Sequence, residues 1–436
     1  GRRQPARNRR ASRGAGLAAR RGQGKEQLVA LETVTPSLVL TRGVPPPPYG
    51  SRFKGGVRET GFHALMAGQA PAHKIHNTFV KPWVFTSTAE EYAAMTEAAV
   101  VIDVTGEEVI ELSGPGAYAV LDRLVPRRLP AASSSRCSYA VMCYPYGGIV
   151  EDGIVVPFSN ELAWWSGGPA ATEQWLYEHS LGTSVTVRSR LDELHVLSIQ
   201  GPRSRDLVVA AGLSAAARLP YFGRAEGTLC EVPVVATRTG YTAELGFDVY
   251  VERERAGVLL ERMLEAGEGT GLRRCGSSTL DIRRLEAAIL NVGQDFDWRH
   301  TPFECGLDWM VALDKEFVGV EALRQHAAAG PRSELVGLVA AAGAKLAAGD
   351  VIGGVAAPEA AGAVIGGVAA PEAAGVLSSA TASPELGCDI AIARVRAGSA
   401  PVGSSVAVGP PGEPARAGAV VCTLPFVDPK RTRARA

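Results

Sequence analysis

The distribution of apolar residues along the chain predicts a mixed α+β fold. Short runs rich in Val and Ile predict strands, and apolar residues spaced three and four apart predict helices. The predicted strands cover 100–104, 108–112, 195–199, 231–237 and 247–251, and the predicted helices cover 117–124, 203–211 and 256–266. The capping pattern Ser87-Thr-Ala-Glu90 predicts a further helix that runs to about Ala99.

One strand–turn–helix pattern occurs twice. Leu112-Ser-Gly-Pro115 and Ile199-Gln-Gly-Pro202 each follow a predicted strand and precede a predicted helix. This repetition predicts two related α+β subdomains, which we place at about 51–190 and 191–330.

After about Gly330 the composition changes to Ala, Gly, Val and Pro, which predicts a small all-β domain over 331–436. Within it, Val351–Gly362 is repeated identically as Val364–Gly375. A solenoid needs at least three repeats, so we interpret 351–376 as a low-complexity insertion and expect one copy to form an extruded loop.

The chain begins with a basic segment, since residues 1–21 contain eight arginines and no acid. This composition is typical of an organelle transit peptide and favours mitochondrial localisation, with a plastid or cytoplasmic location as alternatives. A disordered basic tail is the other interpretation. We therefore treat 1–50 as a targeting or disordered segment that ends in the stiff spacer Pro45–Pro48.

Overall composition narrows the class of protein. The net charge is zero and apolar residues make up 46% of the chain, so no nucleic-acid or membrane partner is expected. No apolar run approaches the roughly 18 residues of a membrane span. The seven cysteines form no CxxC pair, which argues against a disulfide framework. No metal site is expected, because HExxH is absent and His73 and His76 lie in a Pro/Gly-rich connection.

Two adjacent carboxylates, Glu151 and Asp152, lie between the β-branched runs Ile149-Val150 and Ile154–Val156. They follow the turn Tyr144–Gly148, in which the glycines allow positive φ. Neighbouring side chains of a strand point to opposite faces, so the two carboxylates cannot both face solvent. Burying one costs on the order of several kcal/mol unless it is paired. The stretch therefore predicts either a functional carboxylate pair or a polar hairpin at a sheet edge.

A glycine-rich segment, Gly267-Glu-Gly-Thr-Gly271, superficially looks like a phosphate loop. It follows a predicted helix rather than a strand, so we interpret it as a helix stop. No strand–GxGxxG–helix unit occurs elsewhere, which disfavours a nicotinamide or flavin oxidoreductase.

Several ordered stretches give the chain, from about Val57 to Val427, a resemblance to a known superfamily. They are Gly147–Asp152, Leu197–Pro202, Gly240–Phe247, Arg284–Ala287, Thr301–Trp309, Phe317–Leu323 and Ser383–Gly387. Together they resemble the tetrahydrofolate-dependent aminomethyltransferases, which include the glycine cleavage T-protein, dimethylsulfoniopropionate demethylase and the folate domains of sarcosine and dimethylglycine dehydrogenases. The resemblance implies two related α+β subdomains and a C-terminal β-barrel in a ring-like arrangement, with tetrahydrofolate in the central hole.

The resemblance also implies site residues. Asp152 resembles the catalytic carboxylate beside the folate nitrogens, with Glu151 as the alternative if the register differs by one. Glu244 resembles the residue that pairs with the amino-pyrimidine edge, whose adjacent N–H donors suit a carboxylate. The other implied cofactor contacts are Tyr241, Arg284 and Tyr144. A hairpin-tip carboxylate remains the alternative for Glu244, and an internal salt bridge to Glu286 or Asp281 remains the alternative for Arg284.

The one-carbon donor is less clear from the sequence. Arg58–Phe62 and His76–Phe85 resemble the demethylase branch, whose sulfonium substrate would favour aromatic faces. Trp83, Trp164 and Trp165 are the candidate substrate-binding residues, with ordinary core packing as the alternative. Trp164–Ala171 and Asn291–Asp295 depart from the family pattern.

The resulting hypothesis is an enzyme that moves a methyl or aminomethyl group from a sulfonium or amine donor to tetrahydrofolate. A small-molecule donor is expected, or alternatively a lipoyl-bearing carrier protein, as in glycine cleavage. A catalytically silent folate-binding scaffold is the alternative from another functional class.

Overall fold

The computed structural model describes residues 1, 39–41, 57–168, 172–353 and 374–436. Almost all of the predicted targeting segment and its proline spacer therefore lies outside the described residues. In the part of the chain that is described, no helix is both long and apolar enough to cross a bilayer. The described cysteines are all free thiols.

A five-stranded sheet forms one part of the molecule. Its order is β6-β7-β8-β5-β9, from β5 (Glu108–Ser113), β6 (Ser138–Cys143), β7 (Ile149–Ser159), β8 (Leu162–Gly167) and β9 (Thr186–Ser189). Helices α3 (Ala117–Leu124) and α4 (Thr172–Ser180) pack against it. Leu121 and Leu124 of α3 meet Met142, Val155 and Trp165 of the sheet in a buried core.

A six-stranded sheet forms the second part, in the order β11-β12-β13-β10-β4-β14. Its strands are β4 (Ala99–Asp103), β10 (Leu194–Gln200), β11 (Arg224–Leu229), β12 (Val232–Thr237), β13 (Gly246–Glu252) and β14 (Leu272–Arg274). Helices α5 (Ser204–Ala210) and α6 (Arg253–Ala266) bury Leu207, Leu259 and Leu260 against it.

The predicted division between residues 190 and 191 does not coincide with the sheets. Strand β4 lies in the first predicted subdomain, yet it pairs antiparallel with β10, with Asp103 opposite Leu197. It also pairs parallel with β14. The predicted boundary is therefore wrong, since the two halves are built from interleaved segments. The sequence did not show this, because strand pairing between distant segments leaves no local pattern.

The repeated strand–turn–helix pattern is confirmed. Strand β5 leads into α3 and β10 leads into α5. Gly114 and Gly201 occupy equivalent positions, with φ of 110° and 124°, which residues with a side chain rarely adopt. The two turns therefore share a backbone conformation as well as a sequence.

Of the remaining elements of the first 330 residues, the helix capped by Ser87 was predicted from the sequence, whereas the others were not. Helix α2 (Thr88–Glu97) begins where the Ser87 hydroxyl accepts a 3.2 Å hydrogen bond from the Glu90 amide. The other elements are β1 (Val39–Thr41), β2 (Ala72–His76), β3 (Phe79–Val84), α7 (Ser277–Glu286) and α8 (Val320–Ala329). Short 3₁₀ helices cover His63–Leu65, Ala67–Gln69, Ala132–Ser134, Ser214–Arg218, Pro302–Cys305 and Asp308–Met310.

The C-terminal part is a closed barrel, which confirms the implied architecture. Its order is β15-β18-β17-β16-β19-β20, from β15 (Ser333–Ala340), β16 (Val351–Gly353), β17 (Gly375–Ser383), β18 (Cys388–Arg396), β19 (Ser405–Gly409) and β20 (Ala417–Cys422). The first repeat copy supplies β16, and the last residue of the second copy begins β17. Residues 354–373, where the extruded loop is expected, lie outside the described residues.

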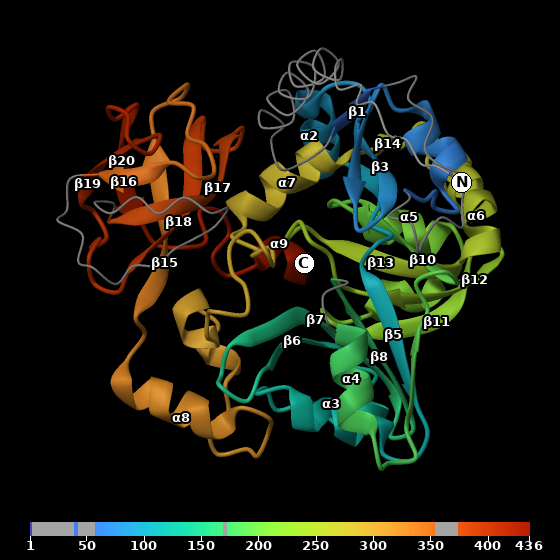
Figure 1. The fold of residues 1–436 in the computed structure, drawn as a ribbon. Helices are drawn as coiled ribbons and strands as arrows, with labels where there is room; N and C mark the ends of the chain where they lie inside the picture. Colours follow the sequence, from blue (N-terminus) through green and yellow to red (C-terminus); the bar gives the residue numbers. More distant parts are fainter. Residues whose placement is uncertain (2–38, 42–56, 169–171, 354–373) are drawn as a thin grey trace.

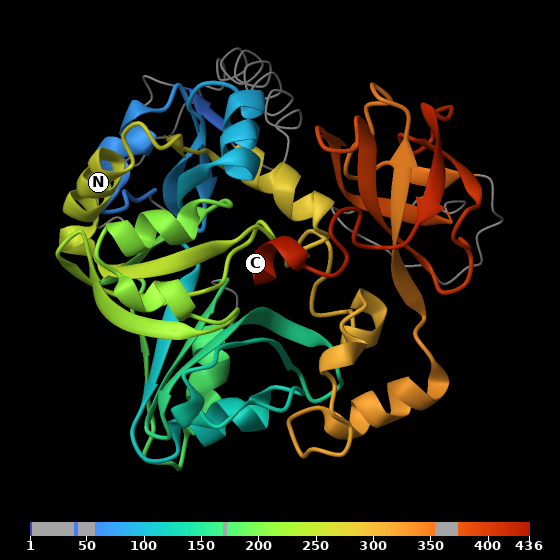
Figure 2. The ribbon, with the colours of Figure 1, turned by 180° about the vertical axis from the view of Figure 1, so that it is seen from behind.

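Figures 1 and 2 show how these parts are arranged. The barrel and the two sheets surround the middle of the molecule, and the short helix α9 (Thr432–Arg435) lies there near the C-terminus. Helix α7 runs from the region of α2 toward the barrel. The three parts therefore face a shared central region, as the ring-like arrangement predicts.

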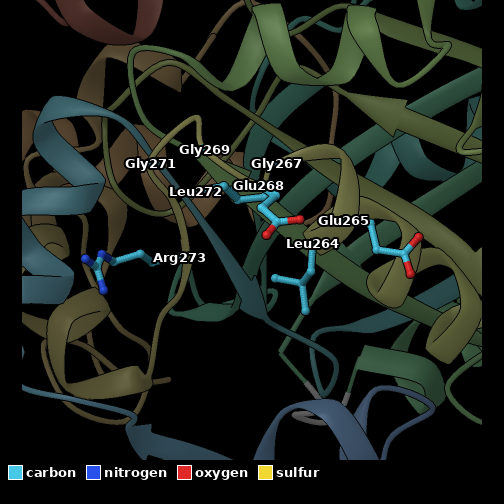
Figure 3. A pocket seen from close by; sticks show the side chains of 8 residues that line it. All are labelled: Leu264, Glu265, Gly267, Glu268, Gly269, Gly271, Leu272 and Arg273. Carbon is cyan, nitrogen blue, oxygen red and sulfur yellow. The ribbon is translucent and has the colours of Figure 1, made fainter.

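The glycine-rich segment ends a helix, as predicted. Gly267 caps α6 through a 3.0 Å hydrogen bond from its amide to the Met263 carbonyl, and the segment then enters β14. It borders a surface pocket of about 480 Å³ (Figure 3), where Glu265 and Arg273 point away from each other. Glu268 is the other acidic lining residue. Two acids and one arginine in the lining disfavour phosphate, which needs positive charge.

Candidate functional site

A tight hairpin places the carboxylate pair. Its turn closes with hydrogen bonds of 2.8 Å from the Tyr144 amide to the Gly148 carbonyl and 2.9 Å from the Gly147 amide to the Tyr144 carbonyl. Gly147 has φ of 90°, and a side chain at Gly148 would overlap the Trp298 carbonyl oxygen. Beyond the turn, a bulge between Met142 and Cys143 shifts the register of β6 against β7, so that Val141 lies opposite Asp152.

Asp152 is half-buried and held by a tyrosine. It shares a sheet face with Tyr139, because residues opposite each other and two apart on one strand point the same way. The Tyr139 hydroxyl donates a 2.9 Å hydrogen bond to Asp152 Oδ2. Burial raises the pKa of Asp152 to about 6, against the lowering effect of the Tyr139 hydrogen bond. At neutral pH the carboxylate is mostly ionised and can accept a proton.

Glu151 has a different environment. Its residue is fully buried, and Oε1 accepts a 3.2 Å hydrogen bond from the Asp152 amide. Oε2 is buried with no partner among the described residues, and Gly168 packs directly against the carboxyl group. Burial, aided by the Asp152 charge, raises the pKa of Glu151 to about 9. Glu151 is therefore neutral near pH 7, which leaves Asp152 as the candidate base.

The loop that carries Glu244 and Tyr241 is built around Gln200. The Gln200 side-chain amide occupies the space where a Cβ atom would stand at both Gly240 and Gly246. Gln200 Nε2 donates to the Thr239 carbonyl at 3.2 Å, and Oε1 accepts from the Thr242 hydroxyl at 2.7 Å. Leu197–Pro202 and Gly240–Phe247, which are distant in the sequence, therefore pack together as one unit.

Glu244 lies almost fully buried at the end of this loop. Its amide donates a 3.1 Å hydrogen bond to the Thr242 hydroxyl, and the preceding Ala243 has φ of 58°. Arg283 Nε and Nη2 donate to Glu244 Oε1 at 3.0 and 2.6 Å, and Arg433 Nη1 donates to the same atom at 3.3 Å. Among the described residues, none bonds Oε2. Glu244 is thus an oriented carboxylate in an ion-pair network rather than a hairpin-tip side chain.

Tyr241 connects this loop to the carboxylate pair. Its hydroxyl donates a 2.7 Å hydrogen bond to the Leu290 carbonyl. Burial raises the pKa of Tyr241 well above its ordinary value, and the nearby Asp152 charge contributes to the rise. Tyr241 in turn contributes to the raised pKa of Tyr139, for which burial is the main cause. Tyr139 contacts Asp152 directly, whereas Tyr241 interacts with both residues through charge and bonds the Leu290 carbonyl.

Arg284 is committed to internal contacts. Its guanidinium donates to Asp295 Oδ2 at 2.6 Å, to Gln294 Oε1 at 3.0 Å and to the Ser379 hydroxyl of the barrel at 2.9 Å. The alternative of a salt bridge to Glu286 or Asp281 is wrong in its partners, because Asp295 takes that place. The role of Arg284 as a direct folate contact stays a prediction.

The structure corrects two of the three tryptophan predictions. Trp165 is fully buried in the core beneath the five-stranded sheet, so it has no surface to offer a substrate. Trp164 packs between Phe158 and Tyr250, and its Nε1 donates to Glu111 at 3.1 Å. Both are core aromatics, since each faces one side of a sheet covered by packed elements. Strand pairing, which a single sequence does not show, determines this.

Trp83 and Tyr144 make their contacts with residues other than Glu151 and Asp152. Lys74 Nζ lies 5.4 Å from the centre of the Trp83 ring. Tyr144 stacks on Tyr146 with centroids 5.3 Å apart and meets Trp175 edge-on. Among the described residues, neither side chain forms a hydrogen bond, an ion pair or a ring contact with Asp152. Their predicted binding roles stay predictions.

Three relevant residues were missed by the sequence analysis: Tyr139, Arg283 and Glu107. Tyr139 could not have been found by extending the hairpin register backwards from the Gly147 turn, because a bulge between Met142 and Cys143 shifts that register by one residue. Arg283 stands beside the quoted Arg-Leu-Glu stretch but gives no local signal of its partners. Glu107, whose Oε1 lies 3.3 Å from His76 Nε2, contributes a charge that raises the pKa of Asp152, although burial is the main cause.

Groups of three or more His, Cys, Asp or Glu side chains that could hold a metal ion are absent from the described residues. The carboxylate oxygens at the site are hydrogen-bond acceptors, which suit an organic ligand with N–H groups. The partner-free Oε2 of Glu244 can accept from such a group, which fits the amino-pyrimidine edge of a folate.

Comparison with known proteins identifies the family. The family model described as the GCVT N-terminal domain matches residues 62–315, and the glycine cleavage T-protein C-terminal barrel domain matches residues 334–428. Trimethylamine-oxide aldolase of Ruegeria pomeroyi is 34% identical over 302 residues, covering 64% of this chain but only 37% of that protein. The aminomethyltransferase of Moorella thermoacetica is 33% identical over 264 residues, covering 60% of this chain and 72% of that protein.

A solved structure agrees with these matches. The glycine cleavage system aminomethyltransferase T from Bartonella henselae superposes with a TM-score of 0.74 over 85% of this chain and 98% of that one, at 21% identity. This similarity confirms the fold, including the terminal barrel. The chain therefore belongs to the glycine cleavage T-protein family, within the folate-dependent aminomethyltransferase superfamily that its motifs resemble.

Proposed function

We propose that this chain transfers a one-carbon group from a sulfonium or amine donor to tetrahydrofolate. The observation that carries the proposal is a pair of oriented carboxylates. The Tyr139 hydroxyl holds Asp152 on β7, and Arg283 and Arg433 hold Glu244 through Oε1. Members of the family carry out this class of transfer.

Each residue has a defined part in the proposed reaction. Tetrahydrofolate supplies the nucleophilic nitrogen when bound. Glu244 Oε2 accepts a hydrogen bond from the amino-pyrimidine edge and orients the ring. With a sulfonium donor, the carbon–sulfur bond would break as the methyl carbon bonds to the folate nitrogen, and a neutral thioether would leave. Asp152, ionised near neutral pH, would accept the proton that the nitrogen loses. Tyr139 holds Asp152 in place through its hydroxyl. Catalysis would rest on positioning and electrostatics.

The donor is proposed by chemical class. The match to trimethylamine-oxide aldolase suggests methylated amines and their oxides as compounds to test, although it covers only 37% of that protein. A positively charged donor carbon would also be favoured beside the ionised Asp152 and the nearby Glu107. Dimethylsulfoniopropionate is the sulfonium donor that the demethylase-like motifs suggest.

A second candidate is the aminomethyltransferase reaction of glycine cleavage, with a lipoyl-bearing carrier protein as the donor. The match to the aminomethyltransferase of Moorella thermoacetica, which covers 72% of that protein, favours it. The two candidates share the folate side of the site and differ only in what delivers the carbon.

Calorimetric titration with tetrahydrofolate tests the proposal first. The proposal expects micromolar binding, followed by methyl- or methylene-tetrahydrofolate formation when a donor is added. Donors to compare are dimethylsulfoniopropionate, trimethylamine oxide, dimethylglycine and an aminomethylated lipoyl carrier. Absence of binding at high micromolar concentration would overturn the proposal. Binding without product from any donor would favour a folate-binding scaffold.

A further inference from the structure

Four charged side chains form a closed cycle of alternating sign beside the candidate folate contact. Arg283 Nη2 lies 2.6 Å from Glu244 Oε1, and Arg283 Nη1 lies 3.1 Å from Glu385 Oε2. Arg433 Nη2 lies 2.6 Å from Glu385 Oε1, and Arg433 Nη1 lies 3.3 Å from Glu244 Oε1. Each arginine bridges both glutamates, and each glutamate is shared by both arginines.

The four members come from four separate segments. Glu244 lies in the loop before β13, Arg283 in α7, Glu385 in the turn between barrel strands β17 and β18, and Arg433 in α9. The Glu244 and Arg283 side chains are 4% and 1% exposed, whereas those of Glu385 and Arg433 are 27% and 37% exposed. The cycle therefore has a buried half beneath the candidate site and a more accessible half contributed by the C-terminal part.

Each member of the cycle is anchored by further contacts. Arg283 also pairs with Glu286 at 2.7 Å, and Glu286 accepts hydrogen bonds from the Tyr92 hydroxyl at 2.6 Å and the Ser383 hydroxyl at 2.5 Å. The backbone amide of Arg433 donates to Asp428 Oδ2 at 2.9 Å. These contacts restrict how far either guanidinium can move.

The cycle leaves the two oxygens of Glu244 in unequal states. Oε1 accepts all three hydrogen bonds from the arginines, while Oε2 receives none from the described residues. A carboxylate held by one oxygen presents the other in a fixed direction, so a ligand does not have to orient it on binding. Neutralisation by two guanidinium groups also makes an almost fully buried carboxylate tolerable.

We infer that Arg283 and Arg433 are positioning residues that orient Glu244 for its ligand, and that Glu385 makes this orientation depend on the docked barrel. The inference rests on the proposed function, because it takes the ligand of Glu244 to be tetrahydrofolate. It assigns the C-terminal barrel and α9 a part in cofactor affinity, through two residues that do not themselves contact the ligand.

The test measures tetrahydrofolate affinity by calorimetry for full-length Arg433→Gln, Glu385→Gln and the double variant. Each single change removes charge-assisted hydrogen bonds from the cycle, so we expect affinity to fall about tenfold. The double variant should lose little more than either single variant, because both act through one network. Arg433→Lys retains the charge and should lose less than Arg433→Gln.

Two matched controls come from the same segments. Arg435→Gln changes the neighbouring arginine of α9, whose guanidinium lies over the Tyr221 ring, and Glu413→Gln changes an exposed acid of the barrel. Both should bind tetrahydrofolate like the wild type. Kinetics give a second readout: KM for tetrahydrofolate should rise in Arg433→Gln while kcat at saturation and KM for the donor stay unchanged. A purely structural role would instead lower kcat together with the urea midpoint.

The outcomes separate the inference from the proposed function. If the wild type binds tetrahydrofolate and Arg433→Gln and Glu385→Gln bind it equally well, the inference is overturned and the proposed function stands. Additive losses in the double variant would also overturn it, because independent effects contradict a shared cycle. If the wild type itself does not bind, the proposed function fails, and the inference fails with it.

Discussion

The Tyr139 hydroxyl donates a 2.9 Å hydrogen bond to Asp152 Oδ2, joining adjacent strands of one hairpin. The bond stabilises the ionised form of Asp152 against burial, which on its own favours the neutral form. Burial raises the pKa of the candidate base, and Tyr139, thirteen positions earlier in the chain, lowers it in part.

Replacing Asp152 by Asn should abolish most turnover while leaving cofactor affinity nearly intact. Asn keeps the shape but cannot accept a proton, so we expect kcat to fall by about 10²–10⁴-fold. Calorimetry should give a tetrahydrofolate affinity within about threefold of wild type. A variant that binds far more weakly yet turns over normally at saturation would show that Asp152 serves binding rather than chemistry.

Replacing Tyr139 by Phe should move the acid limb of the pH profile of kcat/KM upward. The hydrogen bond favours the charged carboxylate, so its loss raises the pKa of Asp152 from about 6, by roughly one unit. More of the base is then protonated at neutral pH, and activity falls there but recovers at higher pH. Tyr144→Phe is the matched control, and it should leave the limb in place. An unshifted limb in Tyr139→Phe would contradict the assignment of Asp152.

Replacing Glu151 by Gln should change how stability depends on pH. The pKa of Glu151 is raised to about 9 in the folded protein from an ordinary value of 4.5. Between these values the folded state holds a proton that the unfolded state has lost, so wild-type stability declines as pH rises through this window. Gln removes that dependence. We expect Glu151→Gln to gain on the order of 1–3 kcal/mol relative to wild type between pH 5 and pH 8.

Urea unfolding at pH 5, 6.5 and 8 measures this difference. The raised pKa of Asp152 contributes to both proteins in the same direction, so the comparison isolates Glu151. Parallel stability profiles for the two proteins would show that Glu151 is ionised in the folded state.

Replacing Gly240 by Ala should damage the cofactor loop. The new methyl group would overlap the Gln200 amide, which would have to leave its contacts with Thr239 and Thr242. We expect a loss of about 1–3 kcal/mol in the free energy of unfolding and weaker tetrahydrofolate binding. Gly418→Ala in β20 is the control, since its new methyl group would have no neighbour within 4 Å. Equal behaviour of the two variants would contradict the packing role of Gln200.

Local sequence patterns predicted several helices and strands of this fold, whereas β2, β3 and α7 were not predicted. Helix α3 spans the residues expected from its apolar spacing, and Ser87 caps α2 where the Ser-x-x-Glu pattern placed it. The Gly114 and Gly201 turns were also predictable, because positive φ is a local demand that glycine meets. Such features depend on residues within a few positions of each other.

Long-range relationships were beyond the same reasoning. Arg433 reaches Glu244 across 189 residues, and neither side chain carries a local mark of the pairing. Adjacent tryptophans in a strand read equally well as cation-binding aromatics or as core residues, and only the packing of α3 and the second sheet shows that Trp165 and Trp164 are core. Of the predicted site residues, the carboxylate pair carried the clearest signal of its own, because buried acids need a physical reason to be there, whereas Glu244 was named only through the family resemblance.

The pairing of β4 with β10 has a consequence for how the protein is made. Strand β4 is synthesised well before β10 and β14, its two partners in the six-stranded sheet. During translation the segment Ala99–Asp103, which is buried in the folded protein, has neither strand partner, so the backbone groups on both of its edges remain unpaired. A nascent chain in this state is exposed to misassembly and suited to chaperone binding. For the same reason, we expect the two halves of the α+β region to be unstable when they are expressed separately.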